Sequence, residues 1–391
     1  MIALITTDAA IAPSLTLSID AQAKALVAAG ERVCGFGAGE PDFDTPEHIK
    51  EAAIRALRDG KTKYAPNEGL PELRAAIAEK LARENRLPYT PAQVLVSNGA
   101  KQSLFQICMA LCREGDEVLI PAPYWLSYPE MVQVAGGRPV FVHGTEAEGL
   151  KVTAAQLEAA VTPRTRVLIL NTPSNPTGVV YTRQELEAIA TVALRHNLYI
   201  VADEIYEKLV YDGAEHVSVG SFDRELLART ITVNGFSKAY AMTGWRLGYC
   251  AGPEAVVRAA AALQSHSTSA PNTFAQYGAV AALRGPQDCV AQMAAEFDQR
   301  RVLLLQRLAA IPGLSCVRPG GAFYVFPRVD QYGLGSLEFT RRLLVEEKVA
   351  VVPGLPFGAD GHVRLSYACS RANIAEGLDR LARFVARLSG S

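Results

Sequence analysis

The sequence has no excess of charge of one sign and no long apolar run. Its 391 residues carry 39 Lys and Arg against 40 Asp and Glu, a formal net charge of -1. No block of like charge stands out that would suit a nucleic-acid backbone or an anionic membrane. No window approaches the length of a membrane span, and the short apolar start meets Asp8 at once, which argues against a signal peptide. We therefore expect small polar molecules as partners, with no nucleic acid and no membrane.

Cysteine is scarce and scattered. The seven cysteines form no C-x-x-C pair, which argues against a disulfide framework and against a zinc cluster. Cys108 and Cys112 would share one face of a helix, but thiols among apolar residues are far more often packing atoms than ligands. We expect no metal, and a location in the reducing cytoplasm.

Length and patterning predict an α/β protein of two domains. A chain of 391 residues exceeds the usual limit for one hydrophobic core, and its composition is ordinary for a globular enzyme. Short β-rich runs alternate with helical patterns through the middle of the chain, which is typical of a mostly parallel sheet with helices on both faces. The predicted strands are 94–96, 117–120, 139–142, 166–170, 199–202, 230–233 and 246–250.

A different pattern begins near residue 284 and predicts a smaller α+β unit. It comprises a long helix, a strand-turn-strand pattern, a second helix and a strand, at 287–308, 314–326, from about 337, and at 349–352. The segment before Pro46 contains one helix, roughly 19–29, which is too little to fold alone, so we expect it to pack with the C-terminal unit. The predicted division is a large domain at 46–284 and a small domain formed by 1–45 and 285–391.

The residues around Lys238 indicate chemistry. Lys238 follows a predicted strand and precedes small residues, two glycines and Arg246, which are poor surroundings for a surface lysine. A primary amine can form a Schiff base with an aldehyde, and small residues with an arginine can cradle a phosphate monoester. Asp203 closes another strand, where it could hold a pyridine nitrogen protonated or simply cap a helix. The combination predicts a lysine that holds pyridoxal phosphate.

Other candidate residues follow the ends of neighbouring strands, where ligands gather in open α/β sheets. The segment 97–101 closes a strand and opens a helix, so its N–H groups could hold a phosphate or merely form a turn. Trp125 could stack on a pyridine ring or pack in the core. Asn175 could donate to a ring hydroxylate, and the proline after it is a candidate for a cis peptide bond. Tyr206, three residues after Asp203, could hydrogen-bond the cofactor hydroxyl.

Arg364 lies within an apolar strand pattern, where an unpaired guanidinium would be costly. A bidentate carboxylate ligand would satisfy this side chain, and so would a structural salt bridge. The residues alone leave both interpretations open.

The order of these motifs resembles the class I aminotransferases, a family of fold-type I pyridoxal-phosphate enzymes, and most closely its bacterial aspartate and aspartate/prephenate subgroup. The resemblance spans nearly the whole chain through the segments 38–46, 64–74, 175–178, 203–206, 235–248 and 364–367. It implies a large cofactor-binding domain of three α/β/α layers, a smaller α+β domain, and pyridoxal 5'-phosphate as cofactor. It also implies a homodimer whose two sites lie at the interface.

Carried over by position, the resemblance implies a role for each matching residue. Lys238 would bind the cofactor aldehyde and act as general base and acid. Asp203 would hold the ring nitrogen, while Tyr206 and Asn175 would contact the phenolic oxygen. The other implied cofactor contacts are Trp125 stacked on the ring, Lys101 beside it, and a phosphate site of Gly99, Ala100, Ser237, Arg246 and the neighbouring subunit's Tyr64. The implied substrate contacts are Gly39, Asn175 and Arg364 on the α-carboxylate, with Trp125, Lys101 and Thr16 nearby.

Two departures from the family pattern bear on affinity and specificity. Gly235 stands where many relatives carry a hydroxyl residue, so one phosphate hydrogen bond is missing, and Ser237 is the candidate to replace it. The segment 264–269 contains no arginine, whereas animal-type aspartate enzymes use one from the partner subunit. Lys101 and Thr16 instead resemble the pair that lets members of the bacterial subgroup take dicarboxylic substrates, including prephenate.

The resemblance favours ping-pong exchange of an amino group between aspartate and 2-oxoglutarate. Transamination of prephenate or aromatic amino acids is the second choice. A β-eliminating lyase could use the same cofactor site, but it would turn over without a keto-acid acceptor. A non-catalytic regulatory module is weakened by the absence of an appended DNA-binding helix pair or basic region.

Overall fold

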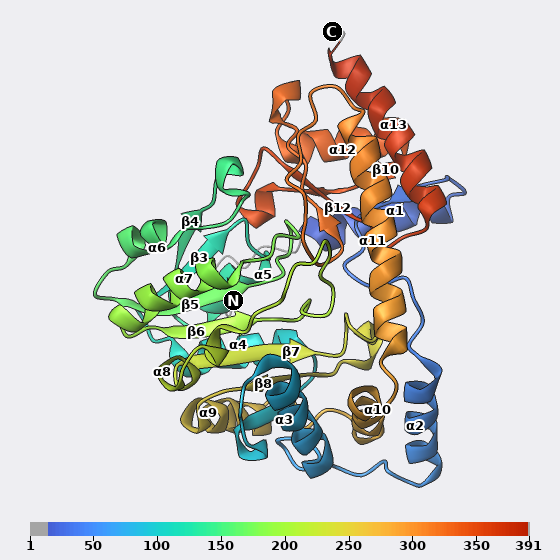
Figure 1. Ribbon diagram of the computed structural model, residues 1–391. Helices are drawn as coiled ribbons and strands as arrows, with labels where there is room; N and C mark the ends of the chain where they lie inside the picture. Colours follow the sequence, from blue (N-terminus) through green and yellow to red (C-terminus); the bar gives the residue numbers. More distant parts are fainter. Residues whose placement is uncertain (1–14, 390–391) are drawn as a thin grey trace, which may run out of the picture.

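The computed structural model describes residues 15–389, without the side chains of residues 15–18, 20 and 389 (Figure 1). Its centre is a seven-stranded sheet of order β2-β8-β7-β6-β5-β3-β4, in which β8 is antiparallel to both neighbours and the other pairs are parallel. The strands are β2 (Val94–Ser97), β3 (Glu117–Ala122), β4 (Arg138–His143), β5 (Thr165–Asn171), β6 (Tyr199–Asp203), β7 (Thr230–Gly235) and β8 (Gly248–Ala251). The predicted mostly parallel sheet is confirmed.

Helices cover both faces of this sheet because successive strand residues point to opposite sides. On one face Val118 and Ile120 pack with α4 (Ala100–Leu111), α5 (Ser127–Val134) and α9 (Glu254–Ser265). On the other face Leu119 packs with α6 (Ala154–Ala160), α7 (Arg183–Arg195) and α8 (Arg224–Leu227). Near β2 and β8 this second face is covered by α2 (Glu47–Arg58), α3 (Pro71–Asn85) and α10 (Thr273–Arg284). The predicted three-layer α/β/α arrangement is confirmed.

A smaller α+β unit packs beside the sheet. Its long helix α11 (Asp288–Ala309) runs next to α13 (Arg371–Ser389), with α12 (Ser336–Glu347) and α1 (Leu15–Ala28) nearby (Figure 1). The strand β1 (Cys34–Gly35) pairs in parallel with β10 (Val349–Ala350). A second small sheet has the order β11 (Val352–Pro353), β12 (Val363–Ser366) and β9 (Tyr324–Val325), all antiparallel. The N-terminal segment thus pairs with C-terminal residues, while the proposed domain boundaries near residues 46 and 284 stay a prediction.

Three strand predictions need correction. The strand expected at 246–250 begins only at Gly248, because Arg246 has a left-handed backbone with φ of 53°. The strand expected at 349–352 is two short strands that pair in different sheets. Of the strand-turn-strand pattern at 314–326, only β9 is a strand, and Ser315 forms an isolated bridge with Arg328.

Within residues 15–389, no helix is both long and apolar enough to cross a membrane.

A buried charged network lies directly after β6. Glu204 accepts a hydrogen bond from Ser218 at 2.7 Å, and its carboxylate is 3.1 Å from His216 Nε2. Glu207 accepts a hydrogen bond from Asn85 at 2.7 Å and pairs with Lys80, whose side chain is 4% exposed. Glu204 follows Asp203 and Glu207 follows Tyr206 in the chain. The contacts of the two glutamates therefore hold segment 203–207 in place.

The network is held together by charge. Burial opposes the ionised form of Glu207, but Lys80 and then His216 outweigh burial and hold the pKa of Glu207 at about 2. The ligand atoms of Glu204, Glu207 and His216 lie within 4.8 Å of one another, a spacing that would also suit a cation. The Lys80 ammonium already contacts Glu207, so the two buried carboxylates are explained without a metal.

We expect Lys80→Met to destabilise the protein by about 3–5 kcal/mol, because it leaves the Glu207 carboxylate buried and unpaired. Lys208→Met is the matched control, since Lys208 pairs with Glu84 at 2.6 Å nearer the surface and its loss should cost about 0–1 kcal/mol. Urea unfolding measures both values. Adding Glu207→Gln to Lys80→Met should recover much of the loss, and equal effects of the two lysine substitutions would contradict this account.

Candidate active site

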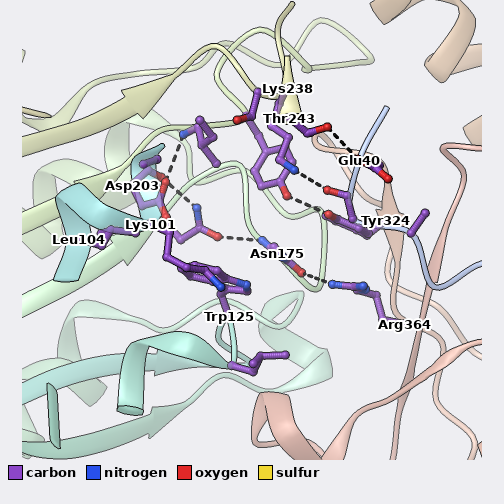
Figure 2. A pocket seen from close by; sticks show the side chains of 18 of the residues that line it. Glu40, Lys101, Leu104, Trp125, Asn175, Asp203, Lys238, Thr243, Tyr324 and Arg364 are labelled. Atoms are coloured by element: carbon purple, nitrogen blue, oxygen red, sulfur yellow. Dashed lines mark hydrogen bonds between the residues drawn. The ribbon is translucent and has the colours of Figure 1, made fainter. Parts of the chain in front are cut away.

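One cavity of about 640 Å³ lies between the carboxyl ends of the central strands and the smaller unit (Figure 2). Sheet topology explains its contents, because the ends of β5, β6 and β7 meet at one edge of the sheet. The strands β9 and β12 supply the opposite wall. The predicted residues that line this cavity are Gly39, Ala100, Lys101, Trp125, Asn175, Asp203, Tyr206, Ser237, Lys238, Arg246 and Arg364.

Asp203 is the last residue of β6, and its side chain is buried. Its carboxylate accepts a hydrogen bond of 2.7 Å from the Tyr128 hydroxyl and one of 3.3 Å from the Ile205 amide. Burial raises the pKa of Asp203 to about 6, although both hydrogen bonds favour the ionised form. A turn follows Asp203 instead of a helix, so the helix N-cap alternative does not apply. Both hydrogen-bond partners are neutral, and a cationic ligand group would stabilise the carboxylate.

Lys238 follows β7 by three residues and is half-buried at the cavity wall. Its Nζ donates a hydrogen bond to the Gly39 carbonyl oxygen and lies 5.9 Å from the centre of the Tyr206 ring. Burial lowers the pKa of Lys238 to about 8, while the nearby Glu40 carboxylate opposes this effect. A substantial fraction of the amine is therefore neutral near pH 7–8, the form that can attack a carbonyl carbon or accept a proton.

Arg364 lies on β12 and is buried, with only 4% of its surface exposed. Its guanidinium donates hydrogen bonds of 3.0 Å to the Asn175 side-chain oxygen and 3.0 Å to the Gly37 carbonyl. Both partners are neutral, and Arg364 Nε has no hydrogen-bond partner among the described residues. The described residues thus offer Arg364 no salt bridge, and an incoming carboxylate would supply the missing charge and acceptors.

Asn175 is placed by the turn after β5. Its backbone N–H donates to the Asn171 side-chain oxygen at 2.8 Å, and Asn171 in turn donates to the Asp203 carbonyl at 2.9 Å. The peptide bond between Asn175 and Pro176 is cis, as the sequence suggested. These contacts tie the Arg364 partner to the strand end that carries Asp203.

The start of α4 forms an anion-binding corner. Gly99 has φ of 84°, and a β-carbon there would collide with the Arg246 guanidinium. Arg246 donates hydrogen bonds to the Thr243 carbonyl at 2.9 Å and the Asn98 carbonyl at 3.3 Å, both of them neutral acceptors. Ala100 is the first residue of the helix, so its N–H points toward this corner, and Ser237 lies on the cavity wall. This arrangement suits a phosphate group.

Lys101 and Trp125 complete the wall of the cavity with a charged side chain and a flat aromatic ring. The Lys101 ammonium lies 4.9 Å from the centre of the Trp125 ring, and Trp125 packs edge-on against Tyr128 at 5.3 Å. Burial, and then the charge of Arg246, lower the pKa of Lys101. A second anionic group of a ligand would relieve both effects.

Three predicted residues are not among those that line the cavity, and one of them, Gly99, stands at the anion-binding corner beside Ala100. Tyr64 is 97% exposed, so its role at the neighbouring subunit's site stays a prediction. Thr16 falls within α1, but its side chain lies outside the described part of the structure.

Sequence reasoning missed two tyrosines of the site. Tyr128 holds Asp203, and its position three residues after Trp125 in a helical turn was the available signal. Tyr324 on β9 contacts Tyr206 and Arg364, and only its neighbourhood in space reveals this.

Comparison with known proteins relates this chain to a family. Residues 31–381 match the model for aminotransferase class I and II. An aspartate aminotransferase of Geobacillus stearothermophilus is 51% identical over 382 residues, covering 96% of this chain and 97% of that protein. An aspartate/prephenate aminotransferase of Cereibacter sphaeroides is 48% identical over 394 residues, covering 98% of each. The structure of the Thermus thermophilus aspartate aminotransferase with maleate aligns with a TM-score of 0.94 at 47% identity, covering 98% of this chain and 100% of that one.

The raised pKa of Asp203 predicts a pH dependence of stability. In protein freed of small molecules, the folded pKa of about 6 exceeds the unfolded value of about 3.9. The protonated carboxyl therefore stabilises the fold fully below pH ~4, and this contribution is lost as the pH rises through 6. Relative to Asp203→Asn, the wild type should lose about 2–3 kcal/mol of unfolding free energy between pH 4 and pH 8. Urea unfolding at both pH values measures this, and an unchanging difference would contradict it.

Proposed function

This chain belongs to aminotransferase class I and II, and we propose that it exchanges an amino group between aspartate and 2-oxoglutarate with pyridoxal 5'-phosphate as cofactor. The observation that carries the proposal is the cavity itself. It joins a lysine of lowered pKa, a buried carboxylate with neutral partners, and a buried guanidinium with neutral partners. Each of these groups matches one charged or reactive part of the cofactor and substrate.

The residues present fit the cofactor. Asp203 would pair with the ring nitrogen, which gives the buried carboxylate its missing cation. Trp125 would lie against the ring, and Tyr206 and Asn175 would contact the phenolic oxygen. The corner of Gly99, Ala100, Ser237 and Arg246 would hold the phosphate. When bound, the cofactor supplies an aldehyde carbon that carries the amino group and a ring that takes up electrons from the substrate Cα.

Lys238 acts as the proton carrier in this proposal. Its Nζ would hold the cofactor aldehyde, and as a free amine it would accept the proton from the substrate Cα and return a proton to the reacting carbon. A pKa of about 8 suits both directions near neutral pH. The Gly39 carbonyl, which accepts a hydrogen bond from Nζ, keeps the amine beside the cavity.

Arg364 and Asn175 would bind the α-carboxylate of the amino acid. Because Arg364 lies on β12, carboxylate binding draws the smaller unit toward the central sheet and excludes water. We accordingly keep residues 46–284 as the large domain and assign 1–45 with 285–391 to the part that closes.

The distal part of the cavity favours a dicarboxylic substrate. Lys101 lies over the Trp125 ring, and the lowering of its pKa by burial and by Arg246 means that a nearby anion would stabilise its charge. Support comes from the relatives named aspartate aminotransferase and from the Thermus structure with maleate. The second candidate is prephenate or aromatic transamination, which the Cereibacter relative and the apolar wall of Leu104, Trp125 and Tyr128 favour. Dependence on a keto-acid acceptor separates either reaction from β-elimination.

We also propose a homodimer in which the exposed Tyr64 of each chain reaches the phosphate of the partner's site. Tyr64 is 97% exposed in the single chain, so its side chain is available to a partner subunit. The expected cytoplasmic location stays a prediction.

Lys238→Ala should lower turnover of aspartate with 2-oxoglutarate by at least about 10³-fold, because it removes the amine that moves the proton. Lys50→Ala, which affects a surface amine paired with Asp44 and Glu47, is the matched control and should retain activity. Steady-state rates and the absorbance change on adding aspartate alone measure the effect. Full turnover by Lys238→Ala would refute the proposed mechanism.

Lys101→Ala should raise the KM for aspartate about 10–100-fold, the loss expected for one charge-assisted hydrogen bond, and leave the KM for phenylalanine within about twofold. Both substrates are measured with 2-oxoglutarate as acceptor. An equal loss for both amino acids would show that Lys101 does not bind the distal carboxylate.

A further inference from the structure

Tyr324 links two parts of the site that the proposed function uses separately. Its side chain is fully buried on β9 and lines the cavity on the same side as Arg364 (Figure 2). Its hydroxyl oxygen lies 2.8 Å from the Tyr206 hydroxyl. The centre of its ring lies 4.5 Å from the central carbon of the Arg364 guanidinium, which stands over the ring face. One side chain thus touches both the group that would meet the cofactor and the group that would meet the substrate.

The register of the small sheet fixes this position. In the antiparallel pair of β9 and β12, Tyr324 stands directly opposite Ser366. Arg364 is two residues from Ser366 and therefore on the same face of the sheet, diagonal to Tyr324, within reach of a long side chain. On its other side the tyrosine is packed edge-on against Tyr206, with ring centres 5.8 Å apart. Both neighbours are set by rigid strands or buried turns.

The ring of Tyr324 can hold the guanidinium of Arg364 in place. A desolvated cation against an aromatic face gains favourable electrostatic energy, and here Phe357 lies 5.2 Å from the same guanidinium. The guanidinium also keeps its two hydrogen bonds to Asn175 and Gly37. Its remaining donors are therefore presented to the cavity in one orientation, which suits two parallel hydrogen bonds to a carboxylate.

The hydroxyl of Tyr324 can set the direction of the Tyr206 proton. Each hydroxyl has one proton, and among the described residues the Tyr324 hydroxyl hydrogen-bonds with that of Tyr206 alone. The positive charge of Arg364 beside the Tyr324 ring favours this phenol as the donor. If Tyr324 donates, the Tyr206 oxygen accepts, and the Tyr206 proton is left for an oxygen atom of a ligand in the cavity.

We propose that Tyr324 is a positioning residue that acts through two contacts: its ring orients Arg364 for the substrate carboxylate, and its hydroxyl orients the Tyr206 proton toward the cofactor oxygen. The inference rests on the proposed function, because the proposed function places the substrate carboxylate at Arg364 and the cofactor oxygen at Tyr206. It predicts that the two contacts can be removed separately, since Tyr324→Phe deletes the hydroxyl and Tyr324→Leu deletes the ring as well.

The test uses the holoenzyme of the wild type, Tyr324→Phe, Tyr324→Leu, Tyr206→Phe and the double variant with both phenylalanines. Tyr324→Phe should leave the KM for aspartate within about twofold and shift the pH midpoint of the bound cofactor's absorbance upward by about half a unit, because the ionised ligand oxygen loses a polarised donor. Tyr324→Leu should also raise the KM about tenfold or more. The midpoint shift of the double variant should equal that of Tyr206→Phe alone.

Tyr332→Phe is the matched control, because it deletes a tyrosine hydroxyl of the smaller unit that donates to the Pro312 carbonyl outside the cavity. Tyr332→Phe should change neither the KM for aspartate nor the pH midpoint of the cofactor absorbance. An equal rise in KM for Tyr324→Phe and Tyr324→Leu would overturn the proposal, and so would midpoint shifts that add in the double variant. Tyr324→Phe decides the hydroxyl part even where Tyr324→Leu folds poorly. A wild type without a cofactor absorbance or aminotransferase turnover would instead refute the proposed function.

Discussion

The carboxylate of Asp203, buried at the end of β6 beside neutral partners, is the constraint on which the site depends. A charged group in this position is unfavourable unless something cationic meets it. The structure holds it in place all the same, through Tyr128 and the Ile205 amide on one side and the charged network of Glu204 and Glu207 on the other. The fold thus stabilises the segment 203–207 strongly enough to maintain one carboxylate in a costly environment.

The same principle extends to two further charged groups around the cavity. Lys238 has its pKa lowered by burial, and Arg364 has two neutral acceptors and, among the described residues, no partner for its Nε. Lys238 comes from the turn after β7 and Arg364 from β12, so the sheet order and the pairing of β9 with β12 decide that they face one another. Binding of cofactor and amino acid would supply the opposite charges, which makes affinity and closure consequences of the same electrostatics.

Much of this arrangement could be predicted from the sequence, because it depends on local pattern. Strand runs and the turn residues after them placed Asp203, Asn175 and Lys238 at one edge of the sheet. The partners that hold them could not be predicted, since they lie far away in the chain: Tyr128 is 75 residues from Asp203 and Tyr324 is 118 from Tyr206. The lysine in the buried network resembles a surface charge in a helix until its contact with Glu207 is seen. The start of β8 was also missed, because the left-handed backbone of Arg246 delays the strand to Gly248.

Attachment of the cofactor to one amine is the central claim, and chemical trapping tests it most directly. The purified protein is treated with borohydride, which converts an imine between a lysine and the cofactor aldehyde into a stable amine, and is then digested and mapped by mass spectrometry. The account predicts a single pyridoxyl-phosphate label on Lys238. A label on another lysine, or none on a protein that retains its turnover, would contradict it.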